Sequence, residues 1–302
     1  MLHQYDVSPF SEKVRVCLGI KGLAWQSVDQ PVIMPKPDLV ALTGGYRRIP
    51  VMQIGADIYC DSALIARELE RRYPSPSLFP TCNSGTDQAA ALWTDRSLFQ
   101  AAMTIAFAAL GPSLSEELIR DREAMSGHSF DRDALKAAAP HMAGQLRAHA
   151  ALLEEQLADG RPFLLGDRAG FVDACAFYSF WFVETLAPSA AVAFSGFTHL
   201  RGWIERIRAV GHGSRSVASR DDAIAAARSS QPEPCCLDDG DKEFAEREVA
   251  VMAMDTGRDP AIGILVGSSQ HHVSLRREDE RAGTVVVHLP RIGYALRPAS
   301  PS

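Results

Sequence analysis

The order of strands and helices in the first 80 or so residues constrains the fold more than any other feature of the sequence. LHQY and AWQSVDQP have strand character and flank a helical stretch, SPFSEKVRVCLGIKGL. KPDLVALT predicts a second helix, IPVMQIGADIYC a hairpin that turns at Gly55-Ala56-Asp57, and DSALIARELERRYP a third, amphipathic helix. A β-α-β unit requires parallel strands, whereas a hairpin adds an antiparallel pair. The sequence therefore predicts an α/β domain over residues 1–76.

After the first domain the residue pattern of the chain changes twice, first to helical and then to strand-like. Residues 84–229 have helical patterns throughout, and FVDACAFYSFWFVETL is apolar all round, which is typical of an innermost helix. We therefore expect an all-α domain of the helical-bundle type. Residues 230–242 are polar and predict a hinge. Residues 243–299 are rich in Val, Ile and Leu between turn signals, and predict a small β-rich module of three or four antiparallel strands.

Composition narrows the class of protein. The 37 acidic and 31 basic residues leave a net charge of −6, so we expect no nucleic-acid partner. No apolar run approaches the length of a membrane span, and MLHQYDVSPF lacks the pattern of a secretory signal. The cysteines form no Cys-x-x-Cys pair, which favours a reducing cytoplasm. They are Cys17, Cys60, Cys82, Cys175, Cys235 and Cys236.

Three segments resemble a known family. SPFSEKVRVCLGIKGLAW resembles the first strand-to-helix segment of cytosolic glutathione transferases, and RRIPVMQIGADIYCDSALIARELERRYP resembles the second half of their thioredoxin-like domain. RPFLLGDRAGFVDACAFY resembles a helix start in their helical domain. The resemblance covers residues 1–215 and implies a thioredoxin-like domain, a helical domain, glutathione as co-substrate and a homodimer. The last 70 or so residues are an extension that the family pattern does not include.

Ser8 is the predicted catalytic residue. Pro9 is favoured at the first position of a helix, so Ser8 is expected at the N-cap, beside unsatisfied N–H groups. By resemblance, this serine binds the glutathione thiol, and Phe10 of the same motif lines the site. Ser11 is a weaker candidate, one turn into the helix. Serine forms no mixed disulfide, so the motif favours thiolate activation, and Cys17 is expected in the core.

A second group of predicted contacts precedes and begins the third strand. The resemblance implies that Ile49-Pro50 is a cis peptide, with the Ile49 backbone binding the cysteinyl unit of glutathione. A basic residue just before it would meet the glycine carboxylate of glutathione. Arg48 is our choice, with Arg47 beside it and Lys36 as a lesser candidate. The alternative for each cation is a solvated loop position.

A third group lies at the start of the third helix. By resemblance, Asp61 pairs with the γ-glutamyl amine of glutathione and Ser62 binds its α-carboxylate. The simpler alternative is that Asp61 is only an N-cap. At Gly170 the family has a hydroxyl cap, so only the carboxylate of Asp173 is left to bond the preceding loop.

The function predicted from these residues is activation of the glutathione thiolate for attack on an electrophile or a peroxide. A small apolar substrate would bind between the domains, with Trp93, Phe99, Phe107 and Phe180 as conceivable liners that are more often core. The alternative is a non-catalytic relative whose C-terminal module recognises a partner. We expect no metal, because adjacent histidines on a strand face opposite ways and two ligands are too few. The histidines in question are His271, His272 and His288.

Overall fold

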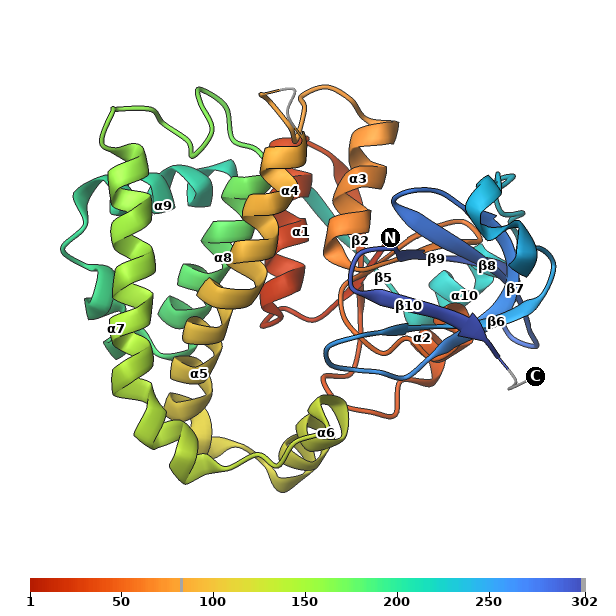
Figure 1. Ribbon diagram of the computed structural model, residues 1–302, viewed down its shortest axis with the longest axis horizontal. Coiled ribbons are helices and arrows are strands. Elements are labelled where there is room, and N and C mark those ends of the chain that lie inside the picture. Colours follow the sequence, from red (N-terminus) through yellow and green to blue (C-terminus); the bar gives the residue numbers. More distant parts are fainter. Residues whose placement is uncertain (82–83, 300–302) are drawn as a thin grey trace.

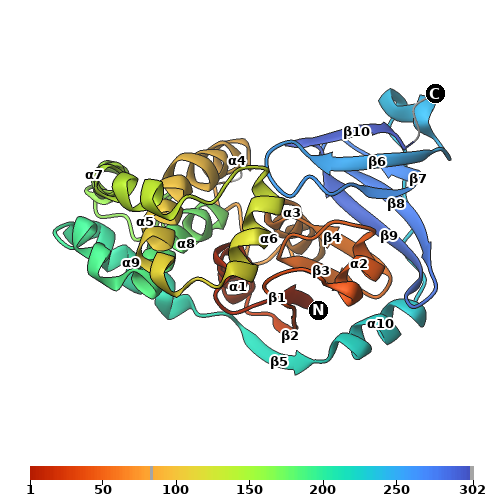
Figure 2. The ribbon, with the colours of Figure 1, turned by 90° about the horizontal axis from the view of Figure 1, so that it is seen from below.

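One mixed sheet runs through the described residues, from the N-terminal strands to the C-terminal ones (Figures 1 and 2). The structure is a computed structural model that describes residues 1–81 and 84–299, so Cys82 lies outside the described residues. Within these residues ten strands pair in the order β10-β6-β7-β8-β9-β4-β3-β1-β2-β5. A layer of helices packs beside the sheet, and α6 lies between these two parts of the molecule.

The N-terminal elements follow the predicted order, and the thioredoxin-like arrangement is confirmed. β1 pairs in parallel with β2 and antiparallel with β3, and β3 forms a hairpin with β4. The elements are β1 (Leu2–Gln4), α1 (Pro9–Ile20), β2 (Ala24–Asp29), α2 (Pro37–Thr43), β3 (Val51–Ile54), β4 (Asp57–Cys60) and α3 (Ser62–Arg72).

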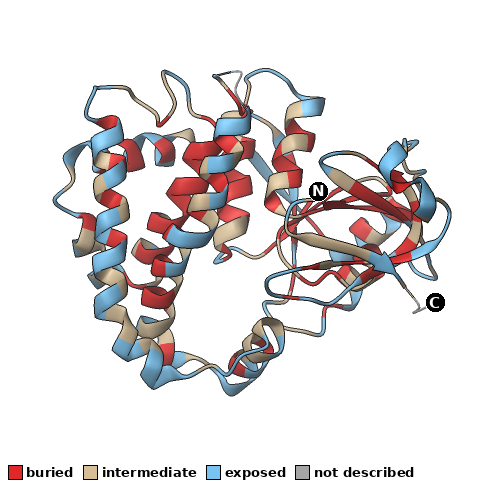
Figure 3. Cartoon of the chain, in the orientation of Figure 1, coloured by how far each residue is buried: buried red, intermediate tan, exposed pale blue. Residues whose placement is uncertain are grey.

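The helical part begins at Ser84 and confirms the predicted bundle. Its elements are α4 (Ser84–Trp93), the π-helical turn η1 (Thr94–Leu98), α5 (Phe99–Leu110), η2 (Gly111–Ser113), α6 (Glu116–Ser126), α7 (Arg132–Leu157), α8 (Phe171–Leu186), η3 (Pro188–Phe194) and α9 (Thr198–Val210). Buried residues concentrate on α8, the predicted innermost helix (Figure 3). At its start, Asp173 accepts hydrogen bonds from the N–H groups of Leu164 and Gly170, at 2.9 and 2.8 Å. This contact with the preceding loop agrees with the prediction.

The end of the predicted all-helical segment differs from expectation. After α9 the chain returns to the sheet as β5 (Ser214–Ala218), which pairs in parallel with β2, and then forms α10 (Arg220–Arg228). The prediction of helix throughout residues 84–229 is therefore wrong for this strand. The reason is that only Ala218 of β5 is buried, so the strand lacks the apolar alternation that would indicate it.

The C-terminal segment is β-rich, as predicted, and it continues the N-terminal sheet. It contains η4 (Asp239–Phe244), β6 (Glu248–Ala253), β7 (Ala261–Ser268), β8 (His272–Asp279), β9 (Gly283–Pro290) and β10 (Tyr294–Pro298). These are five strands rather than three or four. Four of the five pairings that involve them are antiparallel, but β9 pairs in parallel with β4 of the N-terminal hairpin. Because of this pairing the C-terminal strands are part of the N-terminal sheet, and they do not form a separate module joined by a hinge.

Strand alternation explains how the sheet joins two cores. Val51 and Ile58 belong to a cluster that contains α2 and the buried residues of β6–β9, such as Leu275. Their neighbours Met52 and Tyr59 face the other way, into the cluster formed with α1, α3 and the helical part. Because successive side chains on a strand point to opposite faces, one hairpin serves both cores.

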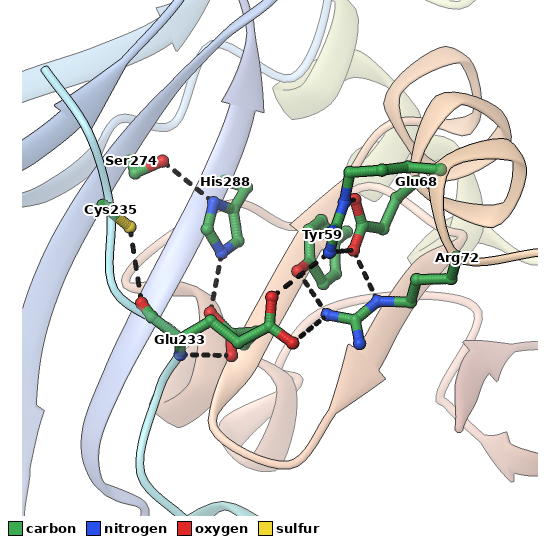
Figure 4. A network of polar contacts seen from close by, with 9 residues as sticks. Tyr59, Glu68, Arg72, Glu233, Cys235, Ser274 and His288 are labelled. Carbon is green, nitrogen blue, oxygen red and sulfur yellow. Dashed lines mark hydrogen bonds and ion pairs between the residues drawn. The ribbon is translucent and has the colours of Figure 1, made fainter.

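Polar contacts also fasten the C-terminal segment to β4 and α3 (Figure 4). His288 of β9 contacts Asp57 Oδ1 through Nε2 and Ser274 Oγ through Nδ1, both at 2.9 Å. Glu233, in the segment before η4, accepts a 2.7 Å hydrogen bond from Arg72 of α3. His288 therefore has protein partners on both ring nitrogens. Residues 230–242, predicted to be a hinge, are also bonded to the sheet, because the Glu233 N–H donates to Asp57 of β4 at 2.9 Å and the Asp238 N–H to Ser268 of β7 at 3.0 Å.

Candidate functional site

A cavity of about 940 Å³ lies between the sheet and the helical part. Three N-terminal segments form one side of it, and helices α5, α6 and α7 form another. Asp255, His271 and Tyr294 of the C-terminal segment also line it. All the residues predicted from the sequence to bind glutathione lie on this one cavity: Ser8, Phe10, Arg48, Ile49, Pro50, Asp61 and Ser62.

Ser8 caps α1 and lines the cavity at the same time. Its Oγ accepts a hydrogen bond from the Ser11 N–H at 3.2 Å, and its side chain is almost fully enclosed. This bond uses an oxygen lone pair, so the hydroxyl proton remains available for a ligand. The Ser11 side chain is buried and is not among the lining residues. Of the two serines, Ser8 is the one that lines the cavity.

The segment before β3 brings a cis peptide to the cavity. The Ile49–Pro50 bond is cis, as the resemblance implied. The two arginines before it are both engaged by carboxylates of other elements: Arg47 by Asp121 of α6, and Arg48 by Asp255 of the β6–β7 loop. Both Arg48 and Arg47 therefore line the cavity with partners already in place.

Lys36 lies on the same wall, with its Nζ 3.2 Å from the Arg47 carbonyl oxygen that accepts its hydrogen bond. Burial, with the nearby Arg122 and Arg47 as smaller causes, lowers the pKa of Lys36 to about 8. Carboxylates already engage Arg47 and Arg48, and Lys36 is the cation of this wall whose charge changes near neutral pH.

The start of α3 presents Asp61 and Ser62 to the cavity. Asp61 has a φ of 77°, which is uncommon for a residue other than glycine. Its Oδ1 accepts the Ala63 N–H at 2.9 Å, and its Oδ2 accepts the Tyr294 hydroxyl at 3.0 Å. Asp61 therefore caps α3 and lines the cavity at the same time.

Ser62 accepts a 3.1 Å hydrogen bond from the Nζ of Lys13, a fully buried lysine of α1. Asp95 balances this charge with both carboxylate oxygens 2.6 Å from Nζ. Burial is the largest effect and would lower the pKa of Lys13, but Asp95 and the other nearby anionic groups together outweigh it and raise the pKa. Ser62 thus accepts from a lysine whose charge Asp95 balances, and its own hydroxyl proton remains available for a ligand at the start of α3.

Aromatic rings connect these polar groups to an apolar wall. The ring of Phe10 packs on Phe99 and Tyr178, with centroids 4.9 and 5.2 Å apart. The wall continues along α5, α7 and α8, where Met103, Phe107, Leu110, Met142 and Phe182 face the cavity. Of the conceivable liners, Phe99 and Phe107 are on the cavity, whereas Trp93 and Phe180 are not among its lining residues. The site therefore has a polar end and an apolar end.

Helix α6 crosses this cleft and is bonded on both sides. Asp121 accepts hydrogen bonds from the Met34 N–H, at 2.9 Å, and from Arg47. The Met125 carbonyl accepts the Gly257 N–H at 2.6 Å. These contacts join α6 to the N-terminal part and to the C-terminal segment.

Sequence reasoning missed three residues at the polar end. In the sequence, Lys13 has the appearance of an ordinary basic residue on an amphipathic helix. Its partner Asp95 lies 82 positions away, so the local sequence gives no sign of the pair. Tyr294 and Asp255 belong to the extension, which no part of the family pattern covers. One signal was present: a lysine one turn after Phe10, on the face that carries the apolar residues of α1.

The cysteines in the described part of the chain differ in their burial. Cys17 is buried, which confirms its predicted place in the core, and burial raises its pKa to about 12. Cys236 is exposed and Cys235 partly so. Across residues 1–81 and 84–299, no three His, Cys, Asp or Glu side chains come together as a metal site would require. No helix in the same residues is long and apolar enough to cross a membrane.

Comparison with known proteins gives the same family for both parts. The family model described as glutathione S-transferase, N-terminal domain, matches residues 2–77, and the one described as C-terminal domain matches residues 132–206. A probable glutathione S-transferase from Zea mays, BZ2, is 34% identical over 67 residues, which are 22% of this chain and 28% of that protein. The chain thus matches only about a quarter to a third of the curated relatives' length.

Solved structures extend the likeness to the whole chain. A GST-like protein from Pseudomonas syringae is 36% identical and has a TM-score of 0.81, with 98% of each chain covered, so the match takes in the C-terminal strands. A glutathione S-transferase from Rhodospirillum rubrum is 20% identical with a TM-score of 0.54 over 68% of this chain and 86% of that one, which shows the fold alone. The chain belongs to the glutathione S-transferase superfamily.

Proposed function

We propose that this protein is a glutathione transferase in which Ser8 stabilises the glutathione thiolate for attack on an electrophilic or peroxide substrate. The observation that carries the proposal is the position of the Ser8 hydroxyl. It lies at the N-terminus of α1 and on the wall of a cavity that also holds the cis Pro50 and the start of α3.

The chemistry requires an ionised thiol. A free thiol has a pKa of about 8.5, so only a few per cent is thiolate at pH 7. A hydroxyl donor and the positive end of a helix both favour the charged form, and Ser8 at the α1 N-cap offers both. The thiolate sulfur then forms a bond to the electrophilic carbon as the leaving group departs with the electron pair. With a peroxide, the thiolate attacks oxygen instead and a second glutathione completes the reduction.

The remaining predicted contacts would hold the tripeptide. The backbone of Ile49 would bind the cysteinyl unit, Asp61 the amine and Ser62 the carboxylate of the γ-glutamyl end, and Arg48 the glycine carboxylate. The hydrogen bond from Lys13 leaves the Ser62 hydroxyl proton free to donate, which supports the carboxylate assignment. Phe10 would pack along the ligand, and the apolar wall of α5, α7 and α8 would take the second substrate.

The test is Ser8→Ala assayed with glutathione and an electrophilic aryl halide. We expect kcat/KM at pH 6.5 to fall about 10- to 100-fold, because a lost donor raises the thiol pKa by roughly one to two units. The loss should shrink at alkaline pH, where the thiol ionises unaided. Ser11→Ala is the matched control, since Ser11 is buried off the cavity.

Two outcomes count against the proposal. Unchanged turnover in Ser8→Ala would show that the thiolate role is wrong. No binding of glutathione at millimolar concentration would favour the non-catalytic alternative, in which the C-terminal segment serves partner recognition. Light scattering of the same samples tests the expected homodimer.

A further inference from the structure

The C-terminal segment reaches the polar end of the cavity and contacts two of the predicted glutathione ligands. Asp255, in the loop between β6 and β7, forms an ion pair with Arg48. Tyr294, the first residue of β10, donates a hydrogen bond to Asp61. Both contacts come from the part of the chain that lies beyond the two matched family domains.

The Tyr294 hydroxyl is placed to act on a ligand through Asp61. Its oxygen is 3.0 Å from Asp61 Oδ2 and 3.4 Å from the Tyr46 hydroxyl, and the two tyrosine rings stack with centroids 6.4 Å apart. Because Tyr294 gives its proton to Asp61, the proton between the two hydroxyls comes from Tyr46. Burial, with Asp61 nearby, raises the pKa of Tyr294, so the hydroxyl stays protonated and remains a donor.

These contacts fix the orientation of the Asp61 carboxylate and leave part of its hydrogen-bonding capacity unused. Oδ1 is held by the Ala63 N–H and Oδ2 by Tyr294, yet an ionised carboxylate accepts about four hydrogen bonds. The remaining lone pairs suit an ammonium group, which has only donors to offer. The tyrosine oxygen itself keeps a lone pair that can accept a further donor of the same ammonium group.

We propose that Tyr294 is a positioning and specificity residue of the glutathione site, which orients Asp61 for the free α-amino group of the γ-glutamyl unit. This inference rests on the proposed function. It assigns to the C-terminal segment a part in recognising the ligand: β10 supplies a wall of the γ-glutamyl subsite. Ligands that keep the thiol but lack the amino group would gain nothing from Tyr294.

The experiment measures binding by the full-length protein, by calorimetry, of glutathione and of its analogue in which hydrogen replaces the α-amino group. We expect Tyr294→Phe to weaken glutathione binding about 5- to 10-fold, the size of one lost charge-assisted hydrogen bond. Binding of the deamino analogue should change less than about twofold. In turnover, the KM for glutathione should rise in the same proportion while kcat is kept, since the thiol end is untouched.

Two controls separate recognition from folding. Tyr73→Phe removes a hydroxyl from an exposed tyrosine at the end of α3 and should alter neither ligand's affinity. Asp61→Asn should abolish the preference of the protein for glutathione over the deamino analogue. Urea unfolding of each variant shows whether stability has changed.

The outcomes distinguish this inference from the proposed function. If wild-type protein binds neither ligand, the proposed function fails and the inference fails with it. If wild-type protein binds glutathione but Tyr294→Phe weakens both ligands equally, or neither, Tyr294 only packs the C-terminal segment and the inference alone is overturned.

Discussion

Lys13 is a fully buried cation, and one carboxylate, that of Asp95, balances its charge. Removing one partner of such a pair leaves an uncompensated charge, at a cost of about 3 to 5 kcal/mol. We predict that Lys13→Met lowers the free energy of unfolding by about 3 kcal/mol in urea titrations. The double variant Lys13→Met/Asp95→Leu should recover part of this loss, because the charge left unpaired is then removed as well.

Two outcomes would contradict the counter-ion role of the Lys13–Asp95 pair. A double variant less stable than Lys13→Met would mean that Asp95 acts mainly through its bond from the Tyr178 hydroxyl, at 3.0 Å, rather than as a counter-ion. Equal stability of wild type and Lys13→Met would contradict the role of Lys13 as the counter-ion of Asp95.

His3 is a buried neutral histidine in β1. Its Nε2 lies 2.9 Å from Gln53 Oε1 and its Nδ1 lies 3.1 Å from Gln30 Nε2, so the ring donates through one nitrogen and accepts through the other. Burial lowers the pKa of His3 to about 4, against a weaker opposing effect of the Gln53 bond. The unfolded chain, with a histidine pKa of about 6.5, therefore binds more protons between pH 4 and 6.5.

This difference makes stability depend on pH with a definite sign. Stability rises with pH where the unfolded state binds more protons, so the His3 contribution is lost as the pH falls from about 6.5 towards 4. We predict that wild type loses about 2 kcal/mol more than His3→Gln between pH 7 and pH 5, as measured by urea unfolding. Identical losses in both proteins would show that His3 is not the titrating group.

The residues that local sequence could identify are those whose role depends on near neighbours. Ser8 precedes a proline at a helix start, and Asp61 precedes Ser62 at another, so both positions could be predicted from a few letters. Lys13 and Tyr294 depend on partners 82 and 233 positions away. No local pattern encodes such a contact, and for Tyr294 the family resemblance ended before it.

At the scale of elements, α6 joins parts of the chain that are far apart in sequence. Asp121 bonds Arg47 and the Met34 N–H of the N-terminal part, while Met125 accepts from Gly257 of the C-terminal segment. Helix α6 itself is amphipathic only weakly, because Ile119 and Asp121 are its buried residues. Its position therefore depends on these few polar contacts more than on an apolar face.

We predict that Asp121→Asn loosens α6 over the cleft. Hydrogen exchange of residues 116–126 should speed up, and the KM for an apolar second substrate should change more than the KM for glutathione. Glu117→Gln is the matched control on the same helix, since Glu117 is exposed and its pairing with Arg120 at 3.8 Å is worth little. Equal exchange in both variants would contradict the role of Asp121.

The helices and strands differ in how clearly a local sequence pattern predicts them. The β-α-β unit and the β3–β4 hairpin carry apolar periodicity and turn residues, so their order was predictable. β5 carries mostly exposed side chains, and the parallel pairing of β4 with β9 joins segments more than 200 positions apart. An edge strand with exposed side chains has no apolar periodicity that would predict it. A pairing between distant segments likewise leaves no pattern in the local sequence.

At the scale of the whole molecule, the division into three domains stays a prediction, but two of its units share one sheet and one core. Val51 and Ile58 of the N-terminal hairpin pack with Leu275 and Leu289 of the C-terminal strands. The β4–β9 pairing and the His288–Asp57 contact cross the same junction. Neither unit buries this core without the other, so we expect both to unfold in one cooperative transition.

Deleting residues 231–302 tests that expectation. The deletion would expose the apolar side of β3, β4 and α2, so we predict a chain that is insoluble or unfolds without a cooperative transition. Leu289→Ala probes the same core in the full chain and should cost about 2 to 5 kcal/mol, with faster hydrogen exchange in β3 and β4 as well as in β9. Val217→Ala, on exposed β5, should cost far less.

A truncated protein that stays folded would contradict the prediction of a shared core. A truncated protein that folds cooperatively and still binds glutathione would show that residues 1–230 suffice for the site. Because Tyr294 and Asp255 are lost in the deletion, such a protein should still differ in one respect. With Asp61 released from Tyr294, its preference for glutathione over the deamino analogue should fall by about the 5- to 10-fold expected for Tyr294→Phe, while turnover of bound glutathione is kept.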